Sequence, residues 1–521
     1  MTMFENEYTW GKAVNEGKVI EFNKNFEDAV EYVKKKFGKK YPCIIGGKEI
    51  FSDETLDVRS PSDTRLVLGT FPKLNESQTN EAILAAKNAF AKWSHTSYKE
   101  RSNVFKHTAD EFSKIKFELA AWMSFENGKT RIEAINDVDE AIDFMRFYSF
   151  QLEENEGFCK QTSHPNPHEK TMTVLKPYGV WGIIAPFNFP SAIAIGMTTG
   201  ALLTGNTAVL KPASATPLSS YFFVHSIINK VPDGAINFVT GEGSIVGRTI
   251  IESSNVDGIA FTGSQTVGMS SFKKFTENTA KPFIAEMGGK NPVIVTKNAN
   301  LDKASEGVMR AAFGFGGQKC SACSRVYVQK DIAEEFIKKL VEKSKSIKVD
   351  MPWSADTFLG PVINKEAVSK FESAVNLARK DGKIILGGNK IKEYEHGYFV
   401  QPTIVTSLPK DHKLITEELF LPFLCIDTYD DFDEAIKLAN KSEYGLTAGI
   451  FSEDKKQLEE FFEKIQAGTV YANRESSATT AALVQSQPFV GWKGSGITGK
   501  GAGGEYYLQQ FLRSQTQTLC D

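Results

Sequence analysis

The pattern of apolar positions changes character near residue 180. Between residues 79 and 150, apolar residues recur at helical spacing, which predicts amphipathic helices that pack against a core. Clear examples are Ile83, Ala86, Phe90 and Trp93, followed later by Val138, Ile142 and Met145. Packing alone accounts for nearly all of this region. A polar loop follows, and alternation over residues 171–175 predicts an exposed strand.

Short apolar runs then alternate with segments of helix length. The first runs are residues 181–185, 207–210, 236–239 and 258–261. This alternation predicts a doubly wound parallel sheet, with ligands bound beyond the carboxyl ends of its strands.

A second alternation begins near residue 291 and predicts a second α/β unit. Its apolar runs are residues 292–295, 403–405, 424–427 and 447–451, with a helix over 432–439. Asp331 and Glu334 resemble a capping box at the start of a helix that carries Phe336. The tail at 506–519 is strand-like, and its partner is either the 171–175 stretch or another subunit.

Composition narrows the class of protein. The chain has 521 residues, enough for several domains, and a net charge of −3, which argues against nucleic acid as a partner. The start of the chain lacks a signal-peptide pattern, and no apolar stretch reaches the roughly 20 residues of a membrane span. The six cysteines show no disulfide spacing, so we expect a cytoplasmic protein. Cys320 and Cys323 form a C-x-x-C pair without further ligands nearby, and no metal site is predicted.

Polar residues follow the predicted strands of the first sheet. Asn188 and Lys211 come after the first and second runs. Gly263 and Ser264 follow the fourth run and open a helix, whose free N–H groups suit a phosphate. Gly241 lies in a Gly-x-Gly after the third run, where a plain turn is an equally good reading.

Two further residues are candidates for a catalytic role. Glu286 precedes a glycine pair, and Cys320 ends a glycine-rich loop, which makes the cysteine a candidate nucleophile. Taken singly, a core cysteine and a solvated glutamate are the commoner readings of such residues.

Together, six segments resemble the aldehyde dehydrogenase superfamily over about residues 45–515. They are residues 185–190, 211–212, 261–264, 286–291, 317–320 and 417–422. The resemblance implies a doubly wound NAD(P)-binding domain, an α/β catalytic domain and a small strand-based oligomerisation element. We assign these to residues 1–158 with 180–285, to 286–472, and to 159–179 with 500–521, respectively. It also implies a homo-oligomer.

The resemblance further implies oxidation of an aldehyde to an acid through a thioester on Cys320, with hydride transfer to NAD(P). Cys320 matches the nucleophile, Glu286 the base that activates water, and the Asn188 amide part of the oxyanion hole. The matching cofactor-binding positions are Ala185, Pro186, Phe187, Lys211, Ser214, Gly241, Gly263, Ser264, Met287, Glu418 and Phe420. Among these, Lys211 and Glu418 resemble the residues that hold the two riboses.

A narrower likeness is to 1-pyrroline-5-carboxylate (glutamate semialdehyde) dehydrogenases, through residues 140–144, 317–325 and 487–489. It implies the last step of proline breakdown. The implied substrate-binding residues are Glu140, Phe189, Ser321, Ala481, Ala482 and Phe489. Ala481 stands where that group has glycine, which leaves other aldehydes open, such as glyceraldehyde or succinate semialdehyde.

Single positions also bear on the choice of cofactor and on two alternative classes of protein, a cysteine hydrolase and a non-catalytic homologue. Ser214 occupies a position where NAD-preferring members often carry glutamate, which leaves NADP open. The resemblance to 1-pyrroline-5-carboxylate dehydrogenases, which commonly use NAD without that glutamate, implies NAD. A cysteine hydrolase would need a histidine partner, and none lies near these motifs in sequence. A non-catalytic homologue would be expected to have lost Cys320 or Glu286, and both are present.

Overall fold

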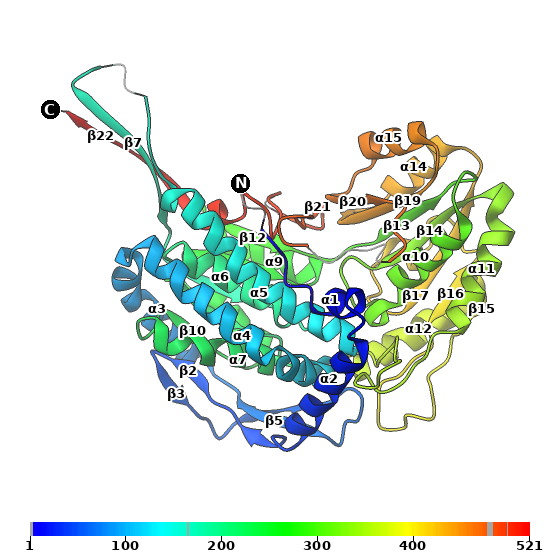
Figure 1. Cartoon of the computed structure of the whole chain (residues 1–521), viewed down its shortest axis with the longest axis horizontal. Helices are drawn as coiled ribbons and strands as arrows, with labels where there is room; N and C mark the ends of the chain where they lie inside the picture. Colours follow the sequence, from blue (N-terminus) through cyan, green and yellow to red (C-terminus); the bar gives the residue numbers. More distant parts are fainter. Residues whose placement is uncertain (1–3, 164–165, 477–482, 498, 521) are drawn as a thin grey trace.

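The computed structural model of the chain describes residues 4–163, 166–476, 483–497 and 499–520. Two seven-stranded sheets lie in separate lobes, and a slender strand arm projects from one of them (Figure 1). The architecture is the α/β class expected from the sequence.

The first sheet has the strand order β12-β11-β8-β9-β10-β2-β3. The strands are β12 (Phe283–Glu286), β11 (Gly258–Thr262), β8 (Val180–Ile184), β9 (Thr207–Lys211), β10 (Ile236–Phe238), β2 (Cys43–Ile45) and β3 (Lys48–Ile50). The strands from β12 to β10 are parallel, as predicted, whereas the β2–β3 hairpin adds an antiparallel edge. The sequence does not predict this hairpin, because strands of three residues are too short to show alternation.

Helices cover both faces of this sheet because its strand residues alternate between two cores. On β9, Ala208 and Leu210 face one hydrophobic cluster, whereas Val209 faces the other. The first cluster contains residues of α4 (Tyr98–Asn127), α5 (Arg131–Glu154), α6 (Ala192–Leu203) and α7 (Pro217–Ile227). The second contains residues of α3 (Glu76–His95), α8 (Arg248–Glu252) and α9 (Gln265–Phe275).

The second sheet has the order β15-β16-β17-β14-β13-β19-β20 and is parallel except for β15. The strands are β15 (Lys383–Leu386), β16 (Thr403–Thr406), β17 (Phe423–Tyr429), β14 (Cys323–Gln329), β13 (Asn291–Val295), β19 (Thr447–Phe451) and β20 (Thr469–Ala472). Its helices are α10 (Leu301–Phe313), α11 (Ala333–Lys345), α12 (Lys365–Asp381), α13 (Lys413–Thr416), α14 (Phe432–Asn440) and α15 (Lys455–Lys464).

The predicted capping box of α11 is wrong. The residue at the N-cap is Ile332, which makes no side-chain cap, and Asp331 lies in a short 3₁₀ turn before the helix. This extra turn moves the helix start past the residue that would have capped it.

Apart from the projecting arm, the remaining helices and small sheets pack around the two lobes, with the β18–β21 ribbon beside the second sheet. They are α1 (Thr9–Asn15), α2 (Val19–Lys34), a small sheet of β1 (Lys39–Lys40), β5 (Val67–Pro72) and β4 (Thr55–Arg59), and a ribbon of β18 (Tyr444–Gly445) with β21 (Trp492–Lys493). The helices within the described ranges include none long and apolar enough to span a membrane.

The projecting arm consists of β6 (Cys159–Gln161), β7 (Glu169–Pro177) and β22 (Leu512–Cys520). β22 pairs with β7 antiparallel, with Thr516 opposite Thr173. The strand-like tail therefore pairs within its own chain, which was one of the two predicted alternatives. The strand begins later than expected, because residues Leu508–Phe511 form a 3₁₀ turn.

Candidate active site

Cys320 and Glu286 line one pocket between the two lobes, with about 680 Å³ of open space. Four of the predicted substrate residues line it too: Glu140, Phe189, Ser321 and Phe489. The rest of the wall is mainly apolar, with Phe144, Tyr148, Met197, Phe261, Ile284 and Tyr507 among its residues. Ala481 and Ala482 lie outside the described residues. The pocket thus places a thiol and two carboxyl groups in a mainly apolar wall that also carries the hydroxyl-bearing residues Ser321, Thr262, Tyr148 and Tyr507.

The loop before Cys320 is held in an unusual backbone conformation. Phe315, Gly316 and Gly317 all have positive φ, between 50° and 65°. A Cβ on Gly317 would lie 2.1 Å from the carbonyl oxygen of Leu421, so only glycine fits there. The Phe315 N–H donates to Glu133 Oε1 at 2.6 Å, which ties the loop to α5. These constraints determine where the nucleophile stands.

The segment after Glu286 holds the backbone around Cys320 in place. Asn291 Nδ2 donates to the carbonyl oxygens of Cys320 at 2.7 Å and of Ala322 at 3.0 Å. A Cβ on Gly289 would lie 2.5 Å from the Cys320 carbonyl oxygen. The glycine therefore allows close approach of this backbone to the nucleophile loop.

The same glycine pair accommodates Glu418. The Gly289 N–H donates to Glu418 Oε1 at 2.8 Å, and a Cβ on Gly288 would lie 2.2 Å from Glu418 Oε2. Burial raises the pKa of Glu418 above its ordinary value. Glu418 therefore stands beside the segment that joins Glu286 to Asn291.

The two cysteines of the C-x-x-C pair have different surroundings. Cys323 is 2% exposed and belongs to the core of the second lobe, with its Sγ donating to the Arg325 carbonyl oxygen. Cys320 faces the pocket. Burial, with smaller contributions from Glu418 and Glu286, raises the pKa of the Cys320 thiol to about 12. Reaction at Cys320 therefore requires removal of its proton or a nearby positive charge.

Both carboxyl groups of the pocket are shifted towards their neutral forms. Glu286 ends β12 and accepts a hydrogen bond from the Gly491 N–H at 2.9 Å, while burial raises its pKa well above the usual value. Burial, followed by the charge of Asp137, raises the pKa of Glu140 likewise. A carboxyl group of raised pKa suits a general base or a buried partner for a cation.

The predicted cofactor positions gather at the carboxyl ends of strands in the first sheet. Lys211 ends β9, is buried and has a pKa lowered by burial to about 8. Ser214 Oγ donates to the Gly241 carbonyl oxygen at 3.0 Å, so these two positions adjoin. Ser264 follows Gly263 and caps α9 by accepting from the Val267 N–H.

Further predicted positions lie close to the carboxyl ends of these strands or contact residues there. Ala185 and Pro186 follow β8, and the rings of Phe187 and Phe420 meet edge to face at 5.8 Å. Asn188 is 3% exposed in the loop between β8 and α6. Met287 is buried, and a Cβ on Gly268 of α9 would lie 2.6 Å from its sulfur. Within the described ranges, no group of three or more His, Cys, Asp or Glu side chains is arranged to hold a metal ion.

Comparisons with known proteins identify the family of the chain. The sequence model of the aldehyde dehydrogenase family matches residues 50–517. The chain belongs to this family. It is 35% identical over 504 residues to the 1-pyrroline-5-carboxylate dehydrogenase of Geobacillus sp. strain WCH70, covering 96% of each protein.

Solved structures of related proteins share the fold. The 1-pyrroline-5-carboxylate dehydrogenase from Thermus with bound NAD is 32% identical, with a TM-score of 0.92 and full coverage of both chains. Proline utilization A from Bdellovibrio bacteriovorus is 34% identical, with a TM-score of 0.94 over 99% of this chain. The chain spans about half of that longer protein, 53% of its length.

In this aldehyde dehydrogenase, one face of α5 forms a wall of the candidate active site, of which the sequence pointed only to Glu140 and otherwise indicated packing. Glu133, Asp137, Glu140, Phe144 and Tyr148 recur at helical spacing. Glu133 holds the nucleophile loop, and the last three line the pocket. Acidic residues at the same helical spacing as Glu140, on a mostly apolar helix, were the signal that could have revealed Glu133 and Asp137.

Asp137 orients the loop that carries Asn188 and Phe189. Its Oδ1 accepts from the Ala192 N–H at 2.7 Å, and its Oδ2 pairs with Lys129 Nζ at 2.6 Å. The same Lys129 Nζ lies 3.5 Å from the centre of the Phe189 ring. This buried ion pair therefore connects α5 to a residue of the pocket wall.

Proposed function

We propose that the protein oxidises glutamate γ-semialdehyde, in equilibrium with 1-pyrroline-5-carboxylate, to glutamate with NAD as hydride acceptor. The reaction would be the last step of proline breakdown. The proposal is supported by the names of the similar proteins and by the Thermus structure with bound NAD. It is also supported by the chemistry of the pocket.

The observation that carries the substrate assignment is Glu140. Its carboxyl group faces the pocket, and no described residue makes a hydrogen bond or ion pair with it. A desolvated carboxylate without a partner is costly, and an ammonium group would offset that cost. Glutamate γ-semialdehyde carries an ammonium, whereas simple aldehydes and succinate semialdehyde do not.

The other pocket residues suit the rest of the substrate. Phe189 and Phe489 would enclose its aliphatic part, and the Ser321 hydroxyl would bind the α-carboxylate. Ala481 and Ala482, outside the described residues, remain proposed contacts to the same carboxylate.

The catalytic roles follow from the chemistry of each group. Cys320 Sγ adds to the aldehyde carbon, and the Asn188 amide with the Cys320 N–H stabilises the oxyanion, each such donor contributing roughly 3 kcal/mol. NAD, when bound, accepts the hydride. Glu286 then takes a proton from water, and the resulting hydroxide cleaves the thioester on Cys320.

The cofactor would occupy the carboxyl ends of the strands in the first sheet. Lys211 and Glu418 would bind the riboses, and the capped start of α9 at Ser264 would receive the pyrophosphate. Ala185, Pro186, Phe187, Ser214, Gly241, Gly263, Met287 and Phe420 complete the proposed set. Residues 1–158 and 180–285 would form the cofactor domain, and 286–472 the catalytic domain.

The arm made of residues 159–179 and 500–521 would join copies of the chain into a homo-oligomer. β22 is exposed over all but its first residue. A ribbon exposed on both faces is only marginally stable alone, which favours a partner surface.

The proposal is tested by comparing aldehydes with NAD, following absorbance of the reduced cofactor. Glutamate γ-semialdehyde should exceed propanal and hexanal in kcat/KM by about 100-fold or more, because buried polar groups discriminate strongly. Succinate semialdehyde should fall between them.

Glu140→Gln provides the matched variant. It should lower kcat/KM for glutamate γ-semialdehyde and leave succinate semialdehyde little changed. Equal turnover of simple aldehydes by the native enzyme would contradict the assignment and indicate an aldehyde dehydrogenase of broad specificity.

A further inference from the structure

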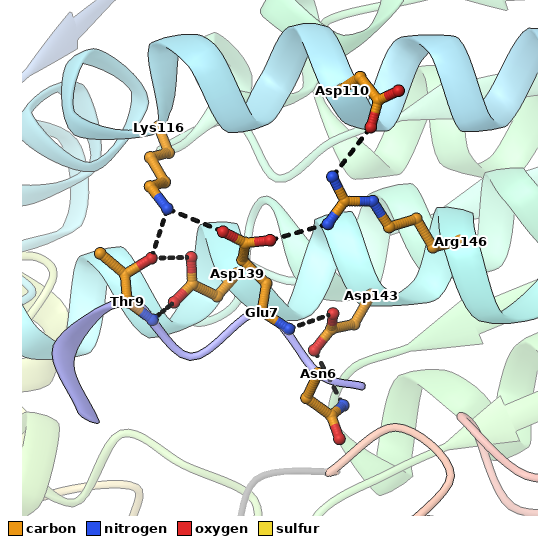
Figure 2. A network of polar contacts seen from close by, with 8 residues as sticks. All are labelled: Asn6, Glu7, Thr9, Asp110, Lys116, Asp139, Asp143 and Arg146. Atoms are coloured by element: carbon orange, nitrogen blue, oxygen red, sulfur yellow. Dashed lines mark hydrogen bonds and ion pairs between the residues drawn. The ribbon is translucent and has the colours of Figure 1, made fainter. Parts of the chain in front are cut away.

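The N-terminal segment from Asn6 to Thr9, which leads into α1, lies along α5, the helix that forms the pocket wall (Figure 2). The Glu7 N–H donates to Asp143 Oδ1, and the Thr9 N–H donates to Asp139 Oδ2, both at 2.8 Å. Two residues of extended chain advance about 6.7 Å and four residues of helix about 6 Å, so the two spacings match. The segment is therefore held at two successive points along the helix.

Ion pairs secure the same segment from both sides. The Glu7 carboxylate pairs with Lys116 of α4 at 2.8 Å and with Arg146 of α5 at 2.7 Å (Figure 2). Burial acts to raise the pKa of Glu7, but these two cations outweigh it and hold that pKa below the usual value. The segment is thus a fixed part of the fold.

Asn6 extends this attachment to a third part of the chain. Its Nδ2 donates to Asp143 Oδ2 at 2.9 Å and to the carbonyl oxygen of Val484 at 3.1 Å. Val484 begins the loop at residues 484–489, which delivers Phe489 to the pocket. The amide of this one side chain therefore connects α5 to the loop at 484–489.

The loop at 484–489 contacts the pocket wall through its own backbone. The Gln485 N–H donates to the Gly503 carbonyl oxygen, and the Gly503 N–H donates to the Tyr148 hydroxyl at 2.9 Å. Phe489 and Ala502 exchange backbone hydrogen bonds, and both line the pocket. A displacement at Val484 would therefore reach Tyr148 and Phe489.

We propose that Asn6 is a positioning residue for the aldehyde, acting by bracing the loop at 484–489 against α5. The inference rests on the proposed function, in which Phe489 encloses the aliphatic part of the substrate. Asn6 does not line the pocket and takes no part in the chemistry. Its effect is on the placement of the wall that the substrate meets.

The test compares Asn6→Ala and Asn6→Asp with the native enzyme. The aspartate keeps the size of the side chain but has no N–H to donate to the Val484 carbonyl oxygen, and it places a second carboxyl group beside Asp143. Losing a bridging hydrogen bond should raise KM for the aldehyde about fivefold and leave kcat and KM for NAD nearly unchanged. Glu5→Ala, an exposed neighbour on the same segment, is the matched control and should change none of these values.

Amide hydrogen exchange gives a second readout that needs no substrate. Exchange at Gln485, Gln487 and Phe489 should accelerate in both Asn6 variants and stay native in Glu5→Ala. Unchanged exchange would overturn the brace, and faster exchange without a change in KM would overturn the positioning role. If the native enzyme oxidises a different aldehyde, the proposed function fails, and KM for that aldehyde then decides the role of Asn6.

Discussion

At the scale of single residues, burial decides which of the two neighbouring cysteines is available. Cys323 is enclosed by the core of the second lobe, whereas Cys320 opens onto the pocket beside Glu286. Both thiols have pKa values raised by burial to about 12, so acidity does not distinguish them. Access to the aldehyde does.

The first prediction concerns these cysteines. Cys320→Ala should abolish aldehyde oxidation, and Cys323→Ala should retain most of it, with a small loss of stability from the cavity left in the core. Steady-state rates and thermal unfolding measure the two effects. An inactive but folded Cys323→Ala enzyme beside an active Cys320→Ala enzyme would reverse the assignment.

The second prediction concerns Glu286 and pH. Only its ionised form accepts a proton from water, and burial raises its pKa, so hydrolysis of the thioester should slow as pH falls through that raised pKa. Glu286→Gln should acylate normally, giving a burst of about one reduced cofactor per active site before a slow phase. The slow phase should also lose this pH dependence. Loss of the burst itself would mean that Glu286 acts before the thioester forms.

At the scale of elements, α5 connects the parts of the site. Its acidic residues reach the nucleophile loop, the loop after β8 and the N-terminal segment, through Glu133, Asp137 and Asp143 respectively. A rigid helix can hold these attachments in register because successive side chains on one face are separated by a fixed rise.

The third prediction tests this role at Asp137. Asp137→Asn still offers an oxygen to the Ala192 N–H but leaves Lys129 charged and unpaired in a buried position. We expect the free energy of unfolding to fall by about 3–5 kcal/mol, seen as a lower Tm. The control is Glu460→Gln, which breaks an exposed pair with Lys464 on α15 and should leave Tm unchanged. Equal effects of the two variants would contradict the buried pair's importance.

At the scale of the whole molecule, the projecting arm has the least to pack against within its own chain. β22 runs along β7 away from the first lobe, with both of its faces exposed (Figure 1). Its unpaired edge offers backbone groups to another strand. This exposure is the physical basis of the proposed homo-oligomer.

The fourth prediction tests that proposal. Thr516→Pro removes a backbone N–H in the middle of β22 and should shift the molecular mass in solution towards the monomer, measured by light scattering after gel filtration. Thr516→Val keeps the strand and should retain the native mass. A native protein that is already monomeric, or an unchanged mass in the proline variant, would refute the role of the arm.

The sequence by itself determined the alternation of strands and helices and supplied the motifs that resemble the aldehyde dehydrogenase family. It predicted β8, β9, β10 and β11 in the first sheet and β13, β16, β17 and β19 in the second, but not β12, β14, β15 or β20. The alternation and the motifs are local properties: period-two and helical patterns arise within one element, and motifs are contiguous. The parallel strands from β8 to β11 and the location of Cys320 and Glu286 in one pocket follow from them. The start of α11 was predicted wrongly and the β2–β3 edge was not predicted, because the local pattern carries too little information at these two places.

Only the tertiary structure decided which side chains meet across long separations in the chain. Apart from Glu140, the stripe on α5 was interpreted as ordinary packing, because a helical pattern does not say what the buried face contacts. The bridge from Asn6 to Val484 joins nearly the whole length of the chain, and Glu418 meets Gly288, which lies far before it in the sequence. Such contacts depend on how elements pack, and packing is set by the sum of many weak interactions rather than by any local pattern.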